Sequence, residues 1–367
     1  MDDLNPASDS PERGSRDLLS AHQSRGHASI VRLTRAWYVA CASSELRAAP
    51  LPRTVLGIPL AIFRSATGAS ALLDRCPHRN VALSKGRVNA GELECPYHGW
   101  RFDGSGTCTA VPGLLSSPTA APSRCADAYP VREQDGLVWI WMAPETPPLT
   151  PPFRIPHVDD PDYTVVRLQM TLPGSLLSAL ENMLDVPHTS FLHGGLFRSA
   201  KTRNRIIARV ARTASGVECE YVGEPRPKGL IGAILAPGGG VVTHFDRFLM
   251  PCLGQVEYRL GPKSHILATQ AMTPESDYIT RTYAVAAFRL PIPGFLIRPV
   301  IEPIVRSILK QDAWVLREQS DAVRRFGGER HTNTDIDLLG PDIWHLLRKA
   351  ERGEVATPAS REIELTV

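Results

Sequence analysis

The chain has 367 residues, 43% of them hydrophobic and 22% charged, which is typical of a globular protein long enough for two domains with cores of their own. Its formal net charge is +3 and no dense basic stripe appears, so nothing in the charge favours a nucleic-acid partner. Seven cysteines in a chain of this length do not indicate a disulfide framework, and the lack of a signal peptide favours a reducing cytoplasm.

The first half of the chain predicts a small β domain. Residues 1–28 are polar and are expected to form a disordered tail. Short apolar segments separated by turn residues then continue to residue 143, so residues 29–143 predict an antiparallel, all-β domain. Residues 144–152 contain five prolines in nine positions, which excludes a core strand or a helix and predicts a linker.

The second half, residues 153–353, predicts a larger domain in which helices cover an antiparallel sheet, followed by a C-terminal tail at 354–367. The fold class is therefore α+β. Helices are expected at Ser175–Asp185, from about Pro303 to Phe326, and at Trp344–Glu351. The expected strands are Tyr163–Leu172, Ile206–Val210, Val217–Val222, Val241–Met250, Gln255–Leu260, Ile266–Met272 and Thr280–Leu290.

Two short motifs in the first domain combine thiols with imidazoles. Cys76 and His78 form one pair, Cys95 and His98 form the other, and a proline follows each cysteine. Thiolates suit iron–sulfur clusters, and two histidines in place of two cysteines raise the reduction potential of a two-iron cluster. A zinc site is the alternative, although common zinc motifs place both cysteines before both histidines, whereas here they alternate.

A second set of metal-binding residue types lies in the second domain. His188 and His193 are five residues apart, which is about 140° on an ideal helix, so both can reach one ion only if the helix breaks near Pro187. Asp312 interrupts the apolar stripe of the long predicted helix, and a buried carboxylate is costly unless a cation meets it. Two histidines and one carboxylate predict a mononuclear ferrous site. A salt bridge between Asp312 and an arginine is the alternative.

Together these motifs resemble the Rieske non-haem iron oxygenases, over nearly the whole chain after the tail. The resemblance implies a Rieske-type [2Fe–2S] cluster held by Cys76, His78, Cys95 and His98, and a mononuclear Fe(II) held by His188, His193 and Asp312. It also implies that the second domain has the helix-grip, START-like fold. Asn80 stands where many loops of this family carry glycine, and asparagine tolerates the positive φ that such a turn requires.

Two further residues are expected to act beside the mononuclear iron. Asp185 lies one helical turn before His188, where it can hydrogen bond a ligand imidazole. By resemblance, Asp185 links His188 to His98 of a neighbouring subunit across the interface of a homotrimer. Asn182 is expected to support the site as well, although a plain amide on the helix surface explains this residue equally well.

The function that the resemblance implies is that of a terminal oxygenase, which uses O₂ and electrons from a ferredoxin or a ferredoxin reductase. No dinucleotide-binding motif is visible, so NAD(P)H would be consumed only by a partner. The segments expected to line the pocket are mostly apolar, with Phe248, Met250 and Phe288 as walls. These segments are Leu176–Leu184, Leu230–Val242, Phe245–Met250 and Thr282–Phe288.

Because no arginine or lysine is placed to bind a carboxylate, we expect a bulky apolar substrate, such as a sterol or another polycyclic molecule, to be hydroxylated or oxidatively demethylated. The alternatives are a small-aromatic O-demethylase or a ring-hydroxylating dioxygenase and, outside enzymes, an electron carrier or a zinc-stabilised binding protein. His244 is either a polar contact to substrate or, as we favour, a satisfied core histidine. Segment Pro291–Leu309 is either a peripheral membrane contact or, as we favour, a buried part of the catalytic domain.

Overall fold

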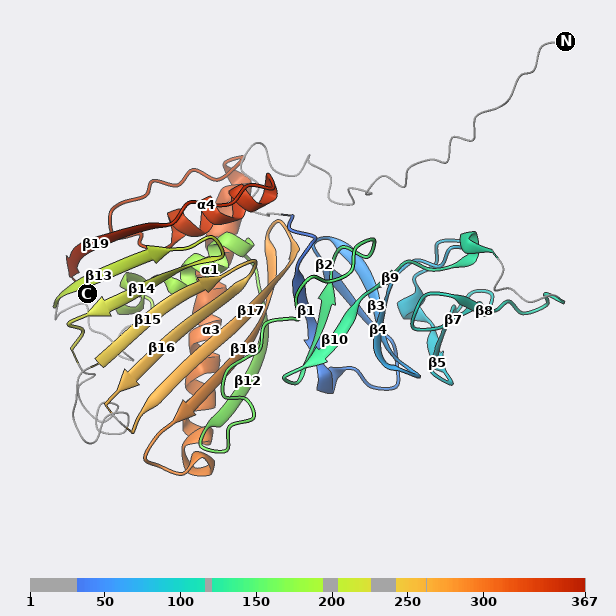
Figure 1. Ribbon diagram of the computed structural model, residues 1–367, viewed down its shortest axis with the longest axis horizontal. Coiled ribbons are helices and arrows are strands. Elements are labelled where there is room, and N and C mark those ends of the chain that lie inside the picture. The colour runs from blue at the N-terminus through green and yellow to red at the C-terminus, as the bar shows by residue number, and fades with distance from the viewer. Residues whose placement is uncertain (1–31, 116–120, 194–203, 226–241, 262, 367) are drawn as a thin grey trace, which may run out of the picture.

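The computed structural model describes residues 32–115, 121–193, 204–225, 242–261 and 263–366. An N-terminal β domain lies beside a large sheet that is covered on one face by helices (Figure 1). The predicted tail at 1–28 and most of the predicted pocket segment 230–242 lie outside the described residues. Residues 144–152 contain no helix or strand, and the domain boundaries stay a prediction.

The N-terminal domain is built of antiparallel hairpins. One sheet has the order β1-β11-β10 and another the order β2-β3-β4-β9. Their strands are β1 (Trp37–Ala42), β2 (Leu51–Val55), β3 (Ile58–Ser65), β4 (Gly68–Leu73), β9 (Ala128–Tyr129), β10 (Val131–Gln134) and β11 (Leu137–Trp141). The turn between β2 and β3 has positive φ at both Leu56 and Gly57, the geometry that matches the twist of a tight hairpin.

A third, smaller sheet at the end of this domain carries the two Cys/His motifs. It has the order β5-β6-β7-β8, with β5 (Arg87–Asn89), β6 (Glu92–Glu94), β7 (Arg101–Phe102) and β8 (Cys108–Ala110). Leu83, Leu93 and Phe102 are fully buried beneath it together with Cys76 and Cys95. A small apolar core of its own therefore supports the loops that present the thiols and imidazoles.

The second domain contains one eight-stranded antiparallel sheet with the order β12-β18-β17-β16-β15-β14-β13-β19. Strands β13 to β18 follow one another as hairpins, and β12 completes one edge by pairing with β18. The strands are β12 (Thr164–Leu172), β13 (Arg205–Arg212), β14 (Gly216–Val222), β15 (Val242–Leu249), β16 (Leu253–Leu260), β17 (His265–Ser276), β18 (Ile279–Arg289) and β19 (Ala359–Thr366). The α+β fold class expected from the sequence is thereby confirmed.

The C-terminal strand β19 corrects one expectation. The prediction of a tail from residue 354 is wrong for Ala359–Thr366, which pair with β13 along their whole length. Apart from Ala359, only Ile363 and Leu365 are apolar in this segment, so its strand pattern is weak in the sequence. The exposed edge of β13 supplies the backbone partners, and Leu365 packs into the main core.

Helices α1 (Leu176–Leu184), α3 (Gly294–Arg325) and α4 (Gly340–Glu351) cover one face of the sheet (Figure 1). The Ser175 hydroxyl caps α1 by accepting a hydrogen bond from the Ser178 backbone N–H at 3.1 Å. Helix α3 begins at Gly294 rather than near Pro303, because packing of Ile297 and Ile301 against β12 and β18 holds turns that contain two prolines. Among the described residues, no helix combines the length and the apolar character that a membrane span requires.

Candidate functional site

The two Cys/His motifs form loops with the same backbone geometry. In the first loop the Asn80 N–H donates to the Cys76 carbonyl at 2.9 Å, and the Cys76 N–H donates to Val81 at 2.8 Å. In the second loop, the Gly99 N–H donates to the Cys95 carbonyl at 3.1 Å, and the Cys95 N–H donates to Trp100 at 2.8 Å. Asn80 has a φ of 62° and Gly99 a φ of 68°, so asparagine adopts in one loop the conformation that glycine adopts in the other.

These loops bring two buried thiols next to each other and two imidazoles next to each other. Cys76 and Cys95 lie beside each other, both nearly fully buried, and burial raises the pKa of the Cys76 thiol to about 11. The His78 and His98 ring centroids are 4.6 Å apart, and the His78 ring stacks on Trp100. The Nδ1 atom of His78 is buried without a hydrogen-bond partner, whereas His98 is exposed. Two neighbouring thiols and two neighbouring imidazoles, one of them with an unpartnered buried nitrogen, fit the donor set of an iron–sulfur cluster with mixed ligands.

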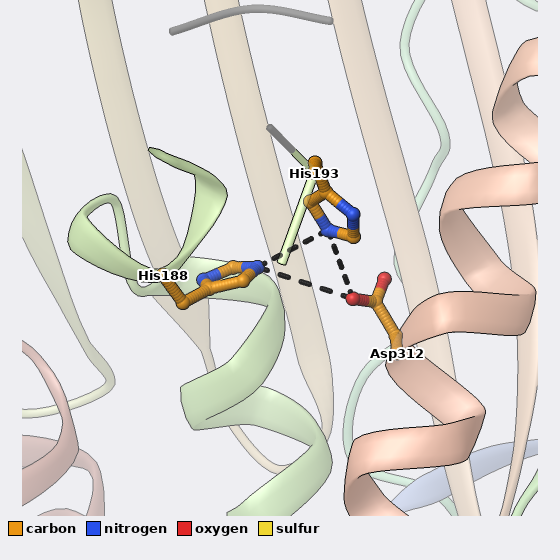
Figure 2. Close-up of side chains that lie close together, drawn as sticks. All are labelled: His188, His193 and Asp312. Carbon is orange, nitrogen blue, oxygen red and sulfur yellow. Dashed lines mark hydrogen bonds and ion pairs between the residues drawn. The ribbon is translucent and has the colours of Figure 1, made fainter. Parts of the chain in front are cut away.

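His188, His193 and Asp312 come together between α1 and α3 (Figure 2). Helix α1 ends at Leu184, and the 3₁₀ turn Pro187–Ser190 redirects the chain. This break, which the spacing of the two histidines predicts, allows both imidazoles to face one point. His193 Nε2 lies 3.0 Å from Asp312 Oδ1 and 3.3 Å from His188 Nε2, and His188 Nε2 lies 3.9 Å from Asp312 Oδ1. Donors that bind one transition-metal ion at about 2.1 Å and at right angles lie about 3 Å apart.

The electrostatics of this triad also fit a cation. Asp312 is buried, and burial raises the pKa of its carboxyl although both histidines oppose that shift. Its Oδ1 atom receives no hydrogen bond, despite its short distance to His193. A buried carboxylate oxygen without a donor, facing two imidazole nitrogens, is an unfavourable arrangement unless a metal ion binds all three atoms.

Each imidazole is held at its other nitrogen. The Nδ1–H of His188 donates to the Asp185 backbone carbonyl, and the Asp185 carboxylate accepts the His188 backbone N–H at 3.1 Å. Burial lowers the pKa of His188, but the hydrogen bond and the charge of Asp185 outweigh it and raise the pKa overall. His193 Nδ1 lies 2.7 Å from Gln311 Oε1, to which it donates. With Nδ1 occupied in both rings, Nε2 remains for a metal.

Gln311 was not assigned a role from the sequence, and its place beside Asp312 is the one signal that could have suggested it. Asn182 hydrogen bonds the Asp312 carboxylate, so its side chain reaches the triad.

Asp185 is 36% exposed at its side chain and, with His188, lines a cavity of about 580 Å³ between α1, α3 and residues 331–340. Glu181 also lines this cavity, and burial raises its pKa to about 7.

His244 is a core histidine. Its ring is fully buried and stacks between Tyr221 and Tyr258, with centroid separations of 4.5 and 4.0 Å. Nδ1 lies 2.7 Å from Glu224 and Nε2 lies 3.0 Å from Asp246, so both ring nitrogens are satisfied by carboxylates. The alternative of a contact to substrate therefore loses its support. Of the predicted pocket walls, Phe248 and Phe288 are buried in the apolar core and Met250 packs against it.

Two family models match the chain. A Rieske [2Fe–2S] domain matches residues 36–121, and the vanillate O-demethylase oxygenase C-terminal domain matches residues 174–351. The first match contains both Cys/His loops, and the second contains the whole triad.

Several known proteins are similar in sequence. The dicamba O-demethylase oxygenase component of Stenotrophomonas maltophilia is 40% identical over 163 residues, which are 43% of this chain and 47% of that protein. The 4beta-methylsterol monooxygenase of Methylococcus capsulatus is 30% identical over 329 residues, which are 84% of each chain. Five relatives, among them the dicamba O-demethylase component, are matched over only 35 to 50% of their own length, so the chain spans half or less of those proteins.

Solved structures share the fold over nearly the whole chain. Dicamba monooxygenase bound to 3,6-dichlorosalicylic acid superposes with a TM-score of 0.73 at 26% identity, over 88% of this chain and 98% of that one. NdmA of Pseudomonas putida CBB5 with caffeine also reaches 0.73, at 20% identity over 89% and 93% of the two chains, and its likeness concerns the fold alone.

Proposed function

The chain belongs to the Rieske non-haem iron oxygenases, and we propose that it is the terminal oxygenase component that hydroxylates or oxidatively demethylates a bulky, largely apolar substrate. The observation that carries the proposal is the triad of His188, His193 and Asp312, whose donor atoms converge within 3.9 Å in a chain that also bears the two Cys/His loops. One oxygen atom of O₂ would enter the substrate, and the other would leave as water after taking up two electrons and two protons.

The proposed ligands follow from the donor atoms. His188, His193 and Asp312 would hold the ferrous ion, and Cys76, His78, Cys95 and His98 the [2Fe–2S] cluster. When bound, the ion supplies O₂ activation and the cluster supplies single electrons. The chain's own contribution is geometric: Asp185 and Gln311 fix the tautomer and orientation of the imidazoles, and His193 and Asp312 are buried.

The route of the electrons is proposed to cross between two copies of the chain. The Cys/His loops belong to the far end of the N-terminal domain, whereas α1 and α3, which hold the triad, lie in the second domain (Figure 1). His98 is exposed in the first domain, and the partly exposed Asp185 lines the cavity in the second. In a homotrimer, His98 of one copy could hydrogen bond Asp185 of the next and so connect the two sites.

The chain is proposed to receive its electrons from a partner protein. A ferredoxin or a ferredoxin reductase would deliver the electrons, and NAD(P)H would be consumed only by that partner. We also propose a reducing cytoplasm, because none of the seven cysteines is joined in a disulfide.

The substrate is proposed to be sterol-like or polycyclic, and the similarity to a 4beta-methylsterol monooxygenase over 84% of the chain supports this choice. A second candidate is O-demethylation of a small aromatic, which the 40% identity to dicamba O-demethylase over a shorter segment favours.

Iron and sulfide analysis of the purified chain, followed by turnover under ¹⁸O₂, tests the proposal. Three irons and two sulfides per chain and ¹⁸O in the product are expected. A colourless protein that binds only zinc would contradict an oxygenase. A coloured protein with two irons that transfers electrons without incorporating oxygen would indicate an electron carrier instead.

A further inference from the structure

The central strands of the large sheet are more exposed on the face that the helices cover than on the opposite face. On β17, the side chains that point away from the helices, from His265 to Ala271, are all buried, partly by the N-terminal domain. The alternate side chains of β17, which face the helices, are only half-buried at Ile266, Ala268 and Gln270. Side chains on a sheet face that packs tightly against helices are normally buried, so the helices leave part of this face accessible.

The half-buried side chains on this face form one connected area, which we call the floor patch. By strand register, its members lie next to one another on β16, β17 and β18. Buried side chains close the patch at both ends, where Gly254 lies under Met183 of α1 and Phe288 lies under Ile297 of α3. The members of the floor patch are Val256, Tyr258, Ile266, Ala268, Gln270 and Ala286.

Gln270 is held in one orientation within this patch. The hydroxyl of the fully buried Thr282 donates to its Oε1 at 2.8 Å. Its cross-strand neighbours on the same face are Gly254 and Ala284, so no bulky side chain flanks the amide. Within the described residues, no hydrogen-bond partner of the Gln270 Nε2 group is found. Two N–H donors therefore remain without a partner among the described residues, on a half-buried patch that is otherwise mainly aliphatic.

The charged side chains described on this face of β12 and β15–β18 are already paired with one another. Neither lysine nor arginine is found among the helix-facing residues described on β12 and β15–β18. The one charged imidazole on this face, His244, is already bonded to Glu224 and Asp246. A carboxylate would therefore lose its hydration on this floor without meeting a cation, whereas a neutral acceptor oxygen would lose much less.

We propose that Gln270 determines substrate specificity by donating an amide N–H to a neutral acceptor oxygen, such as a ketone or an ether, on an otherwise apolar substrate lying over the floor patch. This inference rests on the proposed oxygenase function, whose substrate class it narrows. Gln270 lies at the end of the patch that α1 covers, and α1 leads directly to His188. A hydrogen bond there would orient the substrate relative to the triad.

Equilibrium dialysis of the purified full-length chain with matched probes tests this inference. The probes are 9-fluorenone, the hydrocarbon fluorene and the anion fluorene-9-carboxylate. The wild type should bind the ketone about tenfold more tightly than the hydrocarbon, as one buried hydrogen bond of ordinary strength predicts. Gln270→Leu should remove this preference, and so should Gln270→Glu at a pH where its carboxylate is ionised and has no donor.

Gln255→Leu is the matched control, because Gln255 lies on the neighbouring strand but on the opposite face, bonded to Thr269. If Gln270→Leu fails to fold, Gln270→Glu carries the test. The proposal is overturned if the wild type shows no ketone preference, if the Gln270 variants keep that preference, or if the carboxylate binds more tightly than the ketone. Incorporation of ¹⁸O into any product by the same preparation would show that the oxygenase function stands while the role of Gln270 fails.

Discussion

At the scale of single residues, the hydrogen bonds around the triad leave one nitrogen of each imidazole available to bind a metal ion. The Nδ1 atoms of both imidazoles are occupied, by the Asp185 carbonyl and by Gln311, so their Nε2 atoms face Asp312. Burial raises the pKa of the Asp312 carboxyl, and a cation at the centre would favour its ionised form. The importance of these residues can be tested one at a time.

Replacing Asp312 or His188 by alanine is expected to abolish product formation, because each change removes one of three donor atoms from the metal. The visible absorbance of the iron–sulfur cluster should persist, since the Cys/His loops lie in the other domain. Product analysis and an absorption spectrum of each variant measure the two effects. Asp321→Ala, an exposed position on the same helix, serves as the control and should retain activity. Normal turnover by Asp312→Ala would refute the assignment.

Asp185→Asn is expected to slow oxidation of the cluster in a single turnover by about 10- to 100-fold without loss of either metal. The amide can still accept the His188 backbone hydrogen bond, but it lacks the negative charge that is proposed to connect two subunits. Stopped-flow absorbance of the pre-reduced cluster gives the rate, and iron analysis gives the metal content. Asp337→Asn, in the same cavity, is the control. An unchanged rate would argue against the bridge.

At the scale of elements, the sheet depends on a strand contributed by the last residues of the chain. Strand β19 covers the edge of β13, and Leu365, which is 5% exposed, joins the main core. Charged pairs on the surface, such as Arg209 with Glu362 at 3.0 Å, align the strand but contribute little to the free energy of folding. We attribute the stabilising effect of β19 mainly to Leu365 and to the covered edge.

Leu365→Ala should lower the free energy of unfolding by about 2–3 kcal/mol, the usual effect of truncating a buried leucine. Urea denaturation monitored by circular dichroism measures the change. Glu364→Ala, whose side chain points to solvent in the same strand, should change stability by less than about 0.5 kcal/mol. Deleting residues 359–367 should cost more than Leu365→Ala and should promote self-association through the bare edge of β13. Equal stability of the deletion variant would contradict the role of β19.

At the scale of the whole molecule, a buried charge network makes stability depend on pH. Burial lowers the pKa of His244, but Asp246 and Glu224 outweigh it and raise the pKa to about 9. Because the folded pKa lies above the unfolded value of about 6.5, the protonated imidazole stabilises the fold fully below pH 6.5. That contribution is lost as the pH rises through about 9.

The free energy of unfolding should therefore fall between pH 6.5 and 9.5, by roughly 3 kcal/mol if the whole shift is realised. Urea denaturation at several pH values gives the slope, which should flatten in His244→Gln. His157→Gln, a partly exposed histidine in the loop before β12, should keep the wild-type slope. A His244→Gln protein with the same pH slope as the wild type would show that His244 is not the group responsible.

The sequence predicted best those features that depend on residues close together in the chain. The spacing of Cys76 to His98, the break between His188 and His193, and the alternating strands of the large sheet all depend on residues near one another in the chain. Asp312 could be selected because it interrupts an apolar helical stripe, and the structure places it 3.0 Å from His193. These patterns also carried the resemblance to the family.

Only the tertiary structure decided the contacts between distant segments. Gln311 meets His193 across 118 residues, β19 pairs with β13 about 150 residues away, and Gln270 is oriented by Thr282 on the next strand. None of these residues stands out in the sequence, because glutamine and weakly apolar strands are common and their partners are set by sheet register and helix packing. The chain alone therefore determined which donor atoms are present, and the fold determined what surrounds them, since burial and orientation arise only when distant segments pack together.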